Sequence, residues 1–331
     1  MQNGISIYGV IKTGGSLASR KIDVGSTETP AVFTIGFKDL AAVVSSNPLT
    51  SYDALSREKA IKDLAVHQLV LERVMERFTV VPVKFGTMLE SEDEVITFLE
   101  KAYTLLSDLL DKREGKIELD IAAWWELPEI LPVIAQQNSR VREKQQEIAQ
   151  KGDTVSLEDK MVLGQYIEQA LNARKDSYQQ VILQTLKQEA EDVCLHEPAD
   201  DQMICNVAFL LEKKNEASFR HTIDVLDQDL QSHVHFRVVG PLPTYSFSTI
   251  QIKRIDPDSV EAAKKTLGLP AEITAKAVHD AYHKLAKEFH PDRRGGEEDS
   301  EEFQRIHSAY ITLRDFVDNG LIHPELYQYA Q

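Results

Sequence analysis

The chain has 331 residues, with 37 Lys plus Arg against 53 Asp plus Glu and a net charge of −16. Its length predicts two or three domains, and its 42% hydrophobic residues exclude global disorder. The acidic balance argues against a nucleic-acid binder and against a polybasic membrane anchor, because both need clustered Lys and Arg.

Two cysteines, Cys194 and Cys205, are too few for a disulfide framework or a four-thiolate metal site. The N-terminal residues lack a basic stretch followed by an apolar core, so no secretory signal is expected. No uncharged apolar run approaches the roughly 18–20 residues that span a bilayer. These features predict a cytoplasmic protein that keeps its thiols reduced and does not enter a membrane.

The N-terminal region, 1–125, has the pattern of an α+β domain. Short β-branched runs predict strands, and apolar residues spaced by three and four predict two helices, the second with a capping box of Ser91 and Glu94. The predicted strands are 5–11, 32–37, 41–44, 80–85 and 116–121, and the helices are 57–78, which Ser56 can cap, and 92–111. Their order favours a ferredoxin-like unit.

The next region, 126–255, predicts a helical segment over about 128–196 followed by a second α+β domain of ferredoxin-like type. In that domain a strand at 203–211, a helix at 216–230 and a strand at 234–239 follow one another. An internal duplication of the first domain is one interpretation. Residues 140–151 are polar, and the sequence leaves open whether they form an exposed helix or a mobile arm.

The C-terminal region, 256–331, predicts a small all-α domain. A short helix at 259–267 precedes two amphipathic helices at 274–289 and 300–316, which form a hairpin around a polar loop. That loop begins with His290-Pro291-Asp292.

This region resembles a J domain, the module that engages DnaK-type chaperones and stimulates their ATPase. The matching pieces are LGL at 267–269, AYHKLA at 281–286, FHPD at 289–292 and FQRIHSAY at 303–310. The resemblance implies that the basic face of the first long helix docks on an acidic chaperone surface.

The chaperone-binding residues implied by this resemblance are His290, Pro291, Asp292, Lys276, Lys284 and Lys287. Proline fixes the loop backbone, aspartate supplies an acceptor for a basic group, and histidine could donate a hydrogen bond. Two acidic residues, Asp280 and Glu288, dilute the basic face. The region holds 9 basic and 15 acidic residues, a net charge of −6, so docking depends on the small basic face around Lys284 and Lys287.

A second resemblance covers about 240 residues of the first two regions. The pieces are IYGV at 7–10, DLAAVVS at 39–45, His67, TVVPVKFGT at 79–87 and VGPLPTYSF at 239–247. In this order they are similar to the gas vesicle GvpL/GvpF family. That implies two α+β domains, association with gas vesicles, and interaction with the main hydrophobic shell protein and other gas vesicle accessory proteins.

No pattern for catalysis or for a cofactor emerges, so we expect no enzyme and no cofactor. Phosphate loops, dinucleotide fingerprints and nucleophile elbows are all missing from the sequence. The pairs His233/His235 and His279/His283 supply too few ligands for a metal site. His67 lies on an apolar helix face and is expected to pack, as is the Trp124-Trp125 pair, which could otherwise anchor a partner.

The leading hypothesis is a gas vesicle assembly factor or minor component that binds shell protein and recruits a DnaK-type chaperone. The alternatives are a general co-chaperone with an unrelated client-binding domain, and a structural shell-associated protein with a degenerate J module. Which residues bind shell protein stays open, although an exposed strand edge could pair with a shell-protein strand.

Overall fold

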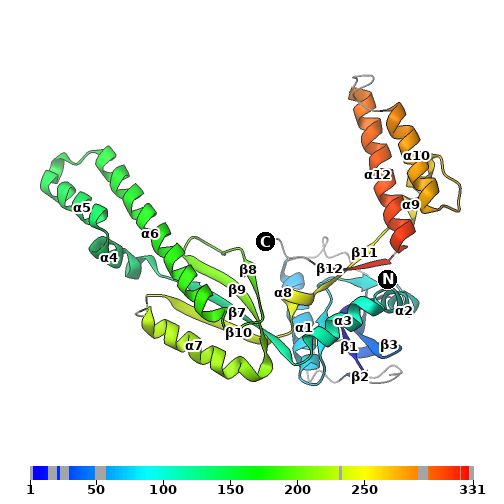
Figure 1. Ribbon diagram of the computed structural model, residues 1–331, viewed down its shortest axis with the longest axis horizontal. Helices are drawn as coiled ribbons and strands as arrows, with labels where there is room; N and C mark the ends of the chain where they lie inside the picture. Colours follow the sequence, from blue (N-terminus) through cyan, green and yellow to red (C-terminus); the bar gives the residue numbers. More distant parts are fainter. Residues whose placement is uncertain are drawn as a thin grey trace. The chain divides into compact units, whose positions relative to one another are not determined.

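The computed structural model describes residues 3–13, 21–22, 30–48, 57–230, 233–289, 297–320 and 322–327 (Figure 1). The predicted α+β class is confirmed, with antiparallel sheets and a helical C-terminal region. The chain forms two compact units, one built from residues up to Leu110 and from Thr249–Tyr327, the other mainly from Asp111–Ser248.

The first unit contains a sheet in the order β2-β3-β4-β1-β5, with β6 also paired to β1. The strands are β1 (Asn3–Lys12), β2 (Lys21–Ile22), β3 (Val32–Phe37), β4 (Leu40–Pro48), β5 (Val80–Pro82) and β6 (Met88–Leu89). β1 lies in the middle, antiparallel to β4, β5 and β6. The runs predicted at 5–11, 32–37 and 41–44 are therefore strands of one sheet, and of the run predicted at 80–85 only 80–82 belongs to it.

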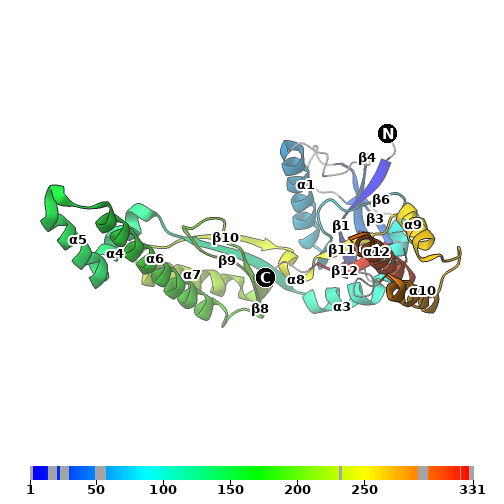
Figure 2. The same ribbon diagram turned by 90° about the horizontal axis from the view of Figure 1, so that it is seen from above.

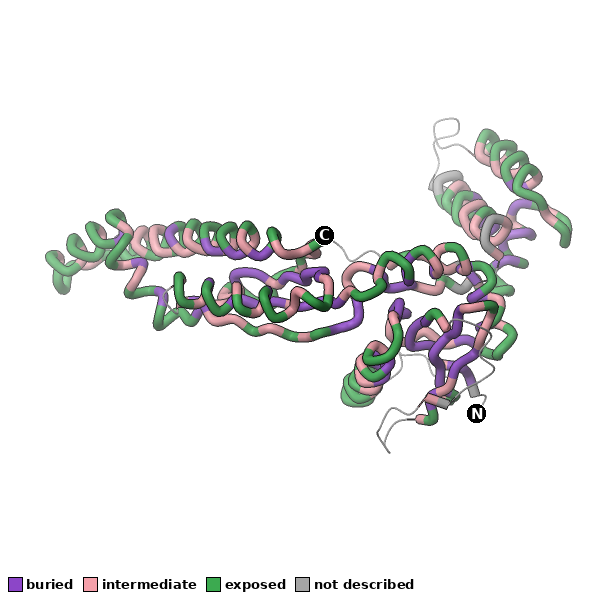
Figure 3. Tube along the Cα trace, turned by 60° about the horizontal axis from the view of Figure 1, so that its bottom comes forward, coloured by how far each residue is buried: buried purple, intermediate pink, exposed green. Residues whose placement is uncertain are grey.

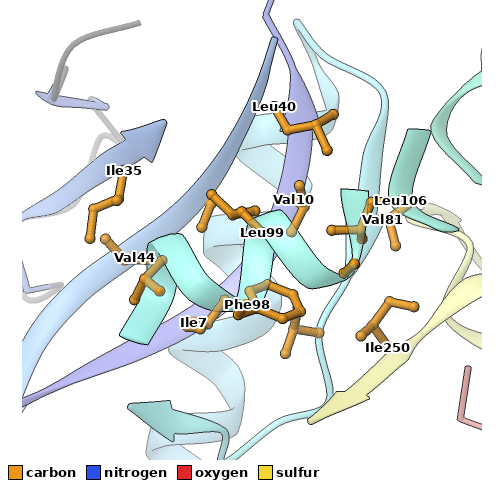
Figure 4. Close-up of a cluster of buried hydrophobic side chains, with 14 of the residues drawn as sticks. Ile7, Val10, Ile35, Leu40, Val44, Val81, Phe98, Leu99, Leu106 and Ile250 are labelled. Atoms are coloured by element: carbon orange, nitrogen blue, oxygen red, sulfur yellow. The ribbon is translucent and has the colours of Figure 1, made fainter. Parts of the chain in front are cut away.

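Two helices, α2 (Glu92–Lys101) and α3 (Tyr103–Arg113), cover one face of this sheet. Ser91 accepts a hydrogen bond from the Glu94 amide at 3.2 Å, which confirms the predicted cap. Phe98 and Leu99 are fully buried against the strands (Figure 4). Each such side chain contributes about 1.5–3 kcal/mol by leaving water.

The opposite face of the sheet carries α1 (Arg57–Met75), which lies beside the strands in Figure 2. Neighbouring residues of a strand point to opposite faces. Ile7 belongs to the core under α2 and α3, whereas the ring of Tyr8 contacts His67 of α1. Gly9 lets α1 approach the sheet, because a Cβ there would lie 2.8 Å from Leu71. Ser56, the predicted cap of α1, lies outside the described residues.

A two-stranded ribbon joins the C-terminal region to this unit. The strands β11 (Ile250–Arg254) and β12 (Ile322–Leu326) are antiparallel, with Arg254 opposite Ile322. Ile250 and Ile322 both enter the core that contains Phe98, and Figure 4 shows the Ile250 side chain there. The helices α9 (Pro257–Leu267), α10 (Ala275–Glu288) and α12 (Glu297–Asn319) lie between the two strands along the chain. They are therefore an insertion in a hairpin.

The second unit contains a sheet in the order β10-β7-β9-β8. Its strands are β7 (Lys116–Trp124), β8 (Asp192–His196), β9 (Met203–Glu212) and β10 (His235–Leu242), and its other elements include α7 (Glu216–Asp229) and α8 (Tyr245–Ser248). The placement of 116–121 in the first domain's sheet was wrong, because β7 pairs with β9 and β10. The helical prediction for 128–196 was also wrong at its end, where β8 pairs with β9.

The second unit also carries three helices, α4 (Leu127–Gln137), α5 (Ser139–Lys151) and α6 (Leu157–Leu186). Residues 140–151 are helical and mostly exposed (Figure 3). An ion cluster joins α5 to the start of α6, where Lys144 and Lys151 donate to Asp159 at 2.8 and 2.7 Å. Ser156 donates to the same carboxylate, so the polar helix is held by charges where apolar anchors are few.

The expected division at 125/126 and 255/256 remains a prediction. The two compact units of the structure have their boundaries at 110/111 and 248/249, and β12 belongs to the first unit. The physical reason is strand pairing, since a strand must be counted with the sheet that satisfies its backbone.

Candidate functional site

The three inserted helices begin and end at residues suited to those positions. Asp256 caps α9 by accepting from the Ser259 amide at 3.0 Å, and Pro257 occupies the first helical position. Gly268 ends α9 with φ at 65°, a left-handed conformation that glycine adopts without strain. Thr274 caps α10 by accepting from the Ala277 amide at 3.2 Å.

One hydrophobic cluster holds the three helices together. Its buried members are Val260, Ala263, Leu267, Val278, Ile306, Ala309 and Leu313. At the edge of this cluster the ring of Tyr282 stacks on Tyr310, with centroids 4.2 Å apart and planes 20° apart. The Tyr282 hydroxyl is also 3.2 Å from Nδ1 of His307. Tyr282 therefore fixes the position of α10 against α12.

The predicted basic face lies on α10. Lys276, Lys284 and Lys287 are exposed, whereas Val278 of the same helix is buried. Within the described part of the chain, Lys276 and Lys284 form no ion pair. Their charges are therefore available to a partner, although the exposed carboxylate of Asp280 shares this face.

The other predicted docking residues, His290, Pro291 and Asp292, lie outside the described residues. The helix before them ends at Phe289, whose amide donates to the Leu285 carbonyl at 2.9 Å. The structure therefore brings Lys276, Lys284 and Lys287 together on one helix, and the roles of the three loop residues stay predictions.

His67 in the first unit is a packing residue. It is 6% exposed, and its ring lies 5.3 Å from the ring of Tyr8 and 5.5 Å from that of Phe85. Burial lowers its pKa to about 4, while a hydrogen bond to the Val83 backbone acts in the opposite direction. The imidazole is therefore neutral at physiological pH and joins α1 to the sheet.

The two tryptophans lie in the second unit. Trp125 is 2% exposed and its ring contacts Tyr178 of α6, which favours packing over a partner anchor. Trp124 lies beside His235, whose Nε2 is 3.0 Å from a carboxylate oxygen of Glu129. These contacts give His235 a local partner.

The sequence did not reveal a carboxyl pair in the second unit, formed by buried Glu118 and half-buried Asp120. Glu118 is 1% exposed and accepts from the amide and the hydroxyl of Ser246, both at 2.8 Å. The Ser246 hydroxyl also lies 3.1 Å from Nε2 of His196. Burial, and next the neighbouring Asp120, raise the pKa of Glu118, so this carboxyl group resists ionisation.

The only sequence signal for this pair is the alternation of Glu118 and Asp120 with Leu119 and Ile121, which is equally typical of a solvent-exposed strand face. The network ties α8 to β7 through Ser246. It fixes the segment that ends the second unit.

The described helices include none with the length and apolar composition of a membrane span.

The architecture is that of a two-unit α+β protein with a J-like helical module inserted in a hairpin.

Comparisons with known proteins agree with both parts. The sequence model of the family described as gas vesicle synthesis protein GvpL/GvpF matches residues 4–249. Gas vesicle protein F of Nostoc sp. is 28% identical over 205 residues, which are 60% of this chain and 83% of that relative. Gas vesicle protein F of a Streptomyces species is 27% identical over 242 residues, covering 73% of this chain and 98% of that relative. The chain belongs to the GvpL/GvpF family.

The crystal structure of GvpF from Anabaena sp. shares the fold, with a TM-score of 0.61 at 24% identity over 74% of this chain and 98% of that one. The DnaJ domain model matches residues 265–318. Chaperone protein DnaJ of Hydrogenobacter thermophilus is 45% identical over 49 residues, which are 15% of this chain and 14% of that chaperone. The inserted helices are a J domain.

Proposed function

We propose that this protein is an assembly factor or minor component of gas vesicles that binds the main hydrophobic shell protein and recruits a DnaK-type chaperone through its J domain. The residues before about 250 bind the shell protein, and the basic face of α10 with the loop after it engages the chaperone. Tethering client and chaperone on one chain raises their concentration near each other. This role requires no covalent chemistry.

The observation that carries the proposal is the insertion of the J domain in the β11–β12 hairpin. Ile250 and Ile322 pack in the core of the GvpL/GvpF-like part, so the J domain is attached there at both ends. A flexible linker would let the J domain take many positions relative to the core to which it is attached. Two paired strands restrict the position of the J-domain helices.

Binding of shell protein is supported by family membership and by chemistry. A small hydrophobic shell protein would aggregate before assembly, and a partner with a net charge of −16 would keep the complex dispersed. The sheet of the second unit ends in the edge strands β8 and β10, and Leu195 of β8 is 49% exposed. An edge strand of this kind can accept a strand of a partner.

The test is a pull-down from cells that make gas vesicles, comparing the full chain with a variant that lacks only the J domain. Because Arg254 lies opposite Ile322, an Asn-Gly turn replacing 255–321 closes the hairpin and keeps β12. We expect the full chain to capture shell protein and the chaperone, and the variant to capture shell protein alone.

Other outcomes would contradict the proposal. A broad set of captured clients without shell protein indicates a general co-chaperone. Unchanged ATPase stimulation after His290→Gln, or stimulation by neither chain, indicates a structural shell-associated protein with a degenerate J domain.

A further inference from the structure

A cavity of about 270 Å³ lies in the first unit, lined by residues of β1, β4 and α1 and of the segment that follows β5. The lining residues that carry charge, polarity or an aromatic ring include Tyr8, Asn47, Lys59, Asp63, His67 and Phe85. The volume lies just below the range of about 300–1,000 Å³ that is usual for ligand pockets, so the cavity suits a small ligand.

Three of these side chains form an aromatic wall, which consists of Tyr8, His67 and Phe85. Tyr8 and His67 are 4% and 6% exposed, and the ring of Phe85 lies 5.5 Å from that of His67. The register of β1 against β4 shifts between Ile7 and Gly9, so Tyr8 is the extra residue of a bulge, a feature that re-aims a side chain. Because burial keeps His67 neutral at physiological pH, the aromatic wall carries no positive charge.

A carboxylate without a partner also lines the cavity. Asp63 is half-buried, and none of the described residues forms an ion pair or a hydrogen bond with its carboxylate. Taking a charge out of water is costly unless an opposite charge replaces the water. Lys59 stands one helical turn earlier, but it is exposed and takes part in another interaction, so water screens its charge more strongly.

Asn47 adds a neutral acceptor to the cavity. Its Nδ2 donates to the hydroxyls of Ser6 and Ser45, both at 2.9 Å, and the Ser45 hydroxyl lies 2.7 Å from that of Tyr8. These bonds orient the amide beforehand, and no donor in the described part of the chain reaches its Oδ1 atom. An ammonium group has three donors and no acceptor, so a carboxylate and an amide oxygen are suitable partners for it.

We infer that this cavity, the amine cavity defined by Tyr8, Asn47, Asp63, His67 and Phe85, binds the alkyl-ammonium group of a ligand. The carboxylate and the amide oxygen accept from the ammonium group, and the aromatic wall attracts the cation and contacts the methylene groups next to it. A free aliphatic amine and the lysine side chain of a protein share this chemistry. Neither ligand is part of the proposed function, so the inference goes beyond it.

The test titrates cadaverine, a short aliphatic diamine, into the full chain at pH 7 and follows binding by saturation-transfer NMR, which detects weak complexes. N-acetyl-lysine methylamide presents the same group as a protein side chain, and pentanediol is an uncharged analogue of the diamine. We expect saturable binding of at least one of the two amines and none of pentanediol. Tighter binding of cadaverine identifies a free amine as the source, and tighter binding of the lysine derivative identifies a side chain.

Two variants and a matched control locate the binding. Asp63→Asn keeps the shape of the side chain and removes its charge, so the affinity for the amine should fall by about five- to thirtyfold. Phe85→Leu keeps an apolar contact without the aromatic face, and the affinity should fall by about two- to fivefold. Glu100→Gln removes one negative charge from an exposed position of the same unit outside the cavity, and wild-type affinity is expected.

Four outcomes would overturn the inference. They are absence of saturable binding of both amines, equal binding of pentanediol, wild-type affinity of Asp63→Asn, and equal losses in Asp63→Asn and Glu100→Gln. The last of these would mean that only the net charge of the chain attracts the amine.

Discussion

The imidazole of His67 lies 5.3 Å from the ring of Tyr8, in a tilted arrangement that joins α1 to the central strand β1. Since burial lowers the His67 pKa to about 4, the folded state rejects a proton that the unfolded state accepts near its ordinary pKa of about 6.5. The unfolded state therefore binds more protons between these two values, and stability falls as the pH falls.

This difference predicts an acid-sensitive first unit. Lowering the pH from 7 to 4 should cost about 3 kcal/mol at this residue. His67→Gln keeps a side-chain hydrogen-bond donor but does not titrate, so its stability should depend less on pH over this range. Urea unfolding at pH 7, 5.5 and 4 measures the effect. If the free energies of unfolding of wild type and His67→Gln depend on pH in the same way, His67 does not cause the acid sensitivity.

The strand β12 predicts a second result. Ile322 is 5% exposed in the core that contains Phe98, so Ile322→Ala should lower the free energy of unfolding of the first unit by about 2–5 kcal/mol. Leu326 of the same strand is 40% exposed, so Leu326→Ala should change the free energy of unfolding by about 0.5 kcal/mol or less. Thermal unfolding compares the two. Equal losses would mean that β12 does not complete this core.

The carboxyl pair predicts a pH effect of opposite sign. The folded state keeps the Glu118 proton to a higher pH than the unfolded state, whose ordinary pKa is about 4.5, so stability falls as the pH rises through the raised value. Glu118→Gln retains an oxygen for Ser246 and removes the titration. Its melting temperature should therefore fall less than that of wild type as the pH is raised from 4.5. Glu126→Gln, at an exposed glutamate, serves as the control.

The ion cluster predicts local order in α5. Lys144 and next Lys151 hold the pKa of Asp159 well below its usual range, so the carboxylate stays charged and keeps both ammonium groups. Asp159→Asn should speed hydrogen exchange of the amides of α5, whereas Asp153→Asn should not. Exchange measured by mass spectrometry tests this, and unchanged protection of α5 in Asp159→Asn would show that other contacts order the helix.

Much of the architecture could be predicted from local pattern. The cap at Ser91, the helices α9 and α10 and the strand β9 all follow from periodicity and turn residues, because their signals are contained in a few adjacent positions. Strand partners could not be predicted in this way. β7 follows α3 directly but pairs with β9 and β10, a choice made by contacts distant in sequence.

β12 was missed for a different reason. It is 5 residues long and contains Pro324, and a proline within a short run argues against a strand. Pro324 is tolerated here because β12 has a strand partner, β11, on one side.

The insertion of the J domain also sets an order of events during synthesis. A ribosome releases the β1–β6 segment and α2 first, but Ile322 emerges only after α9, α10 and α12. The first unit cannot finish its core until the inserted helices are outside the ribosome. A nascent chain that stops before Ile322 therefore has an unfinished core, and one that stops before the end of α12 also lacks a complete J domain. The core of the first unit is therefore completed only after the J domain has been synthesised.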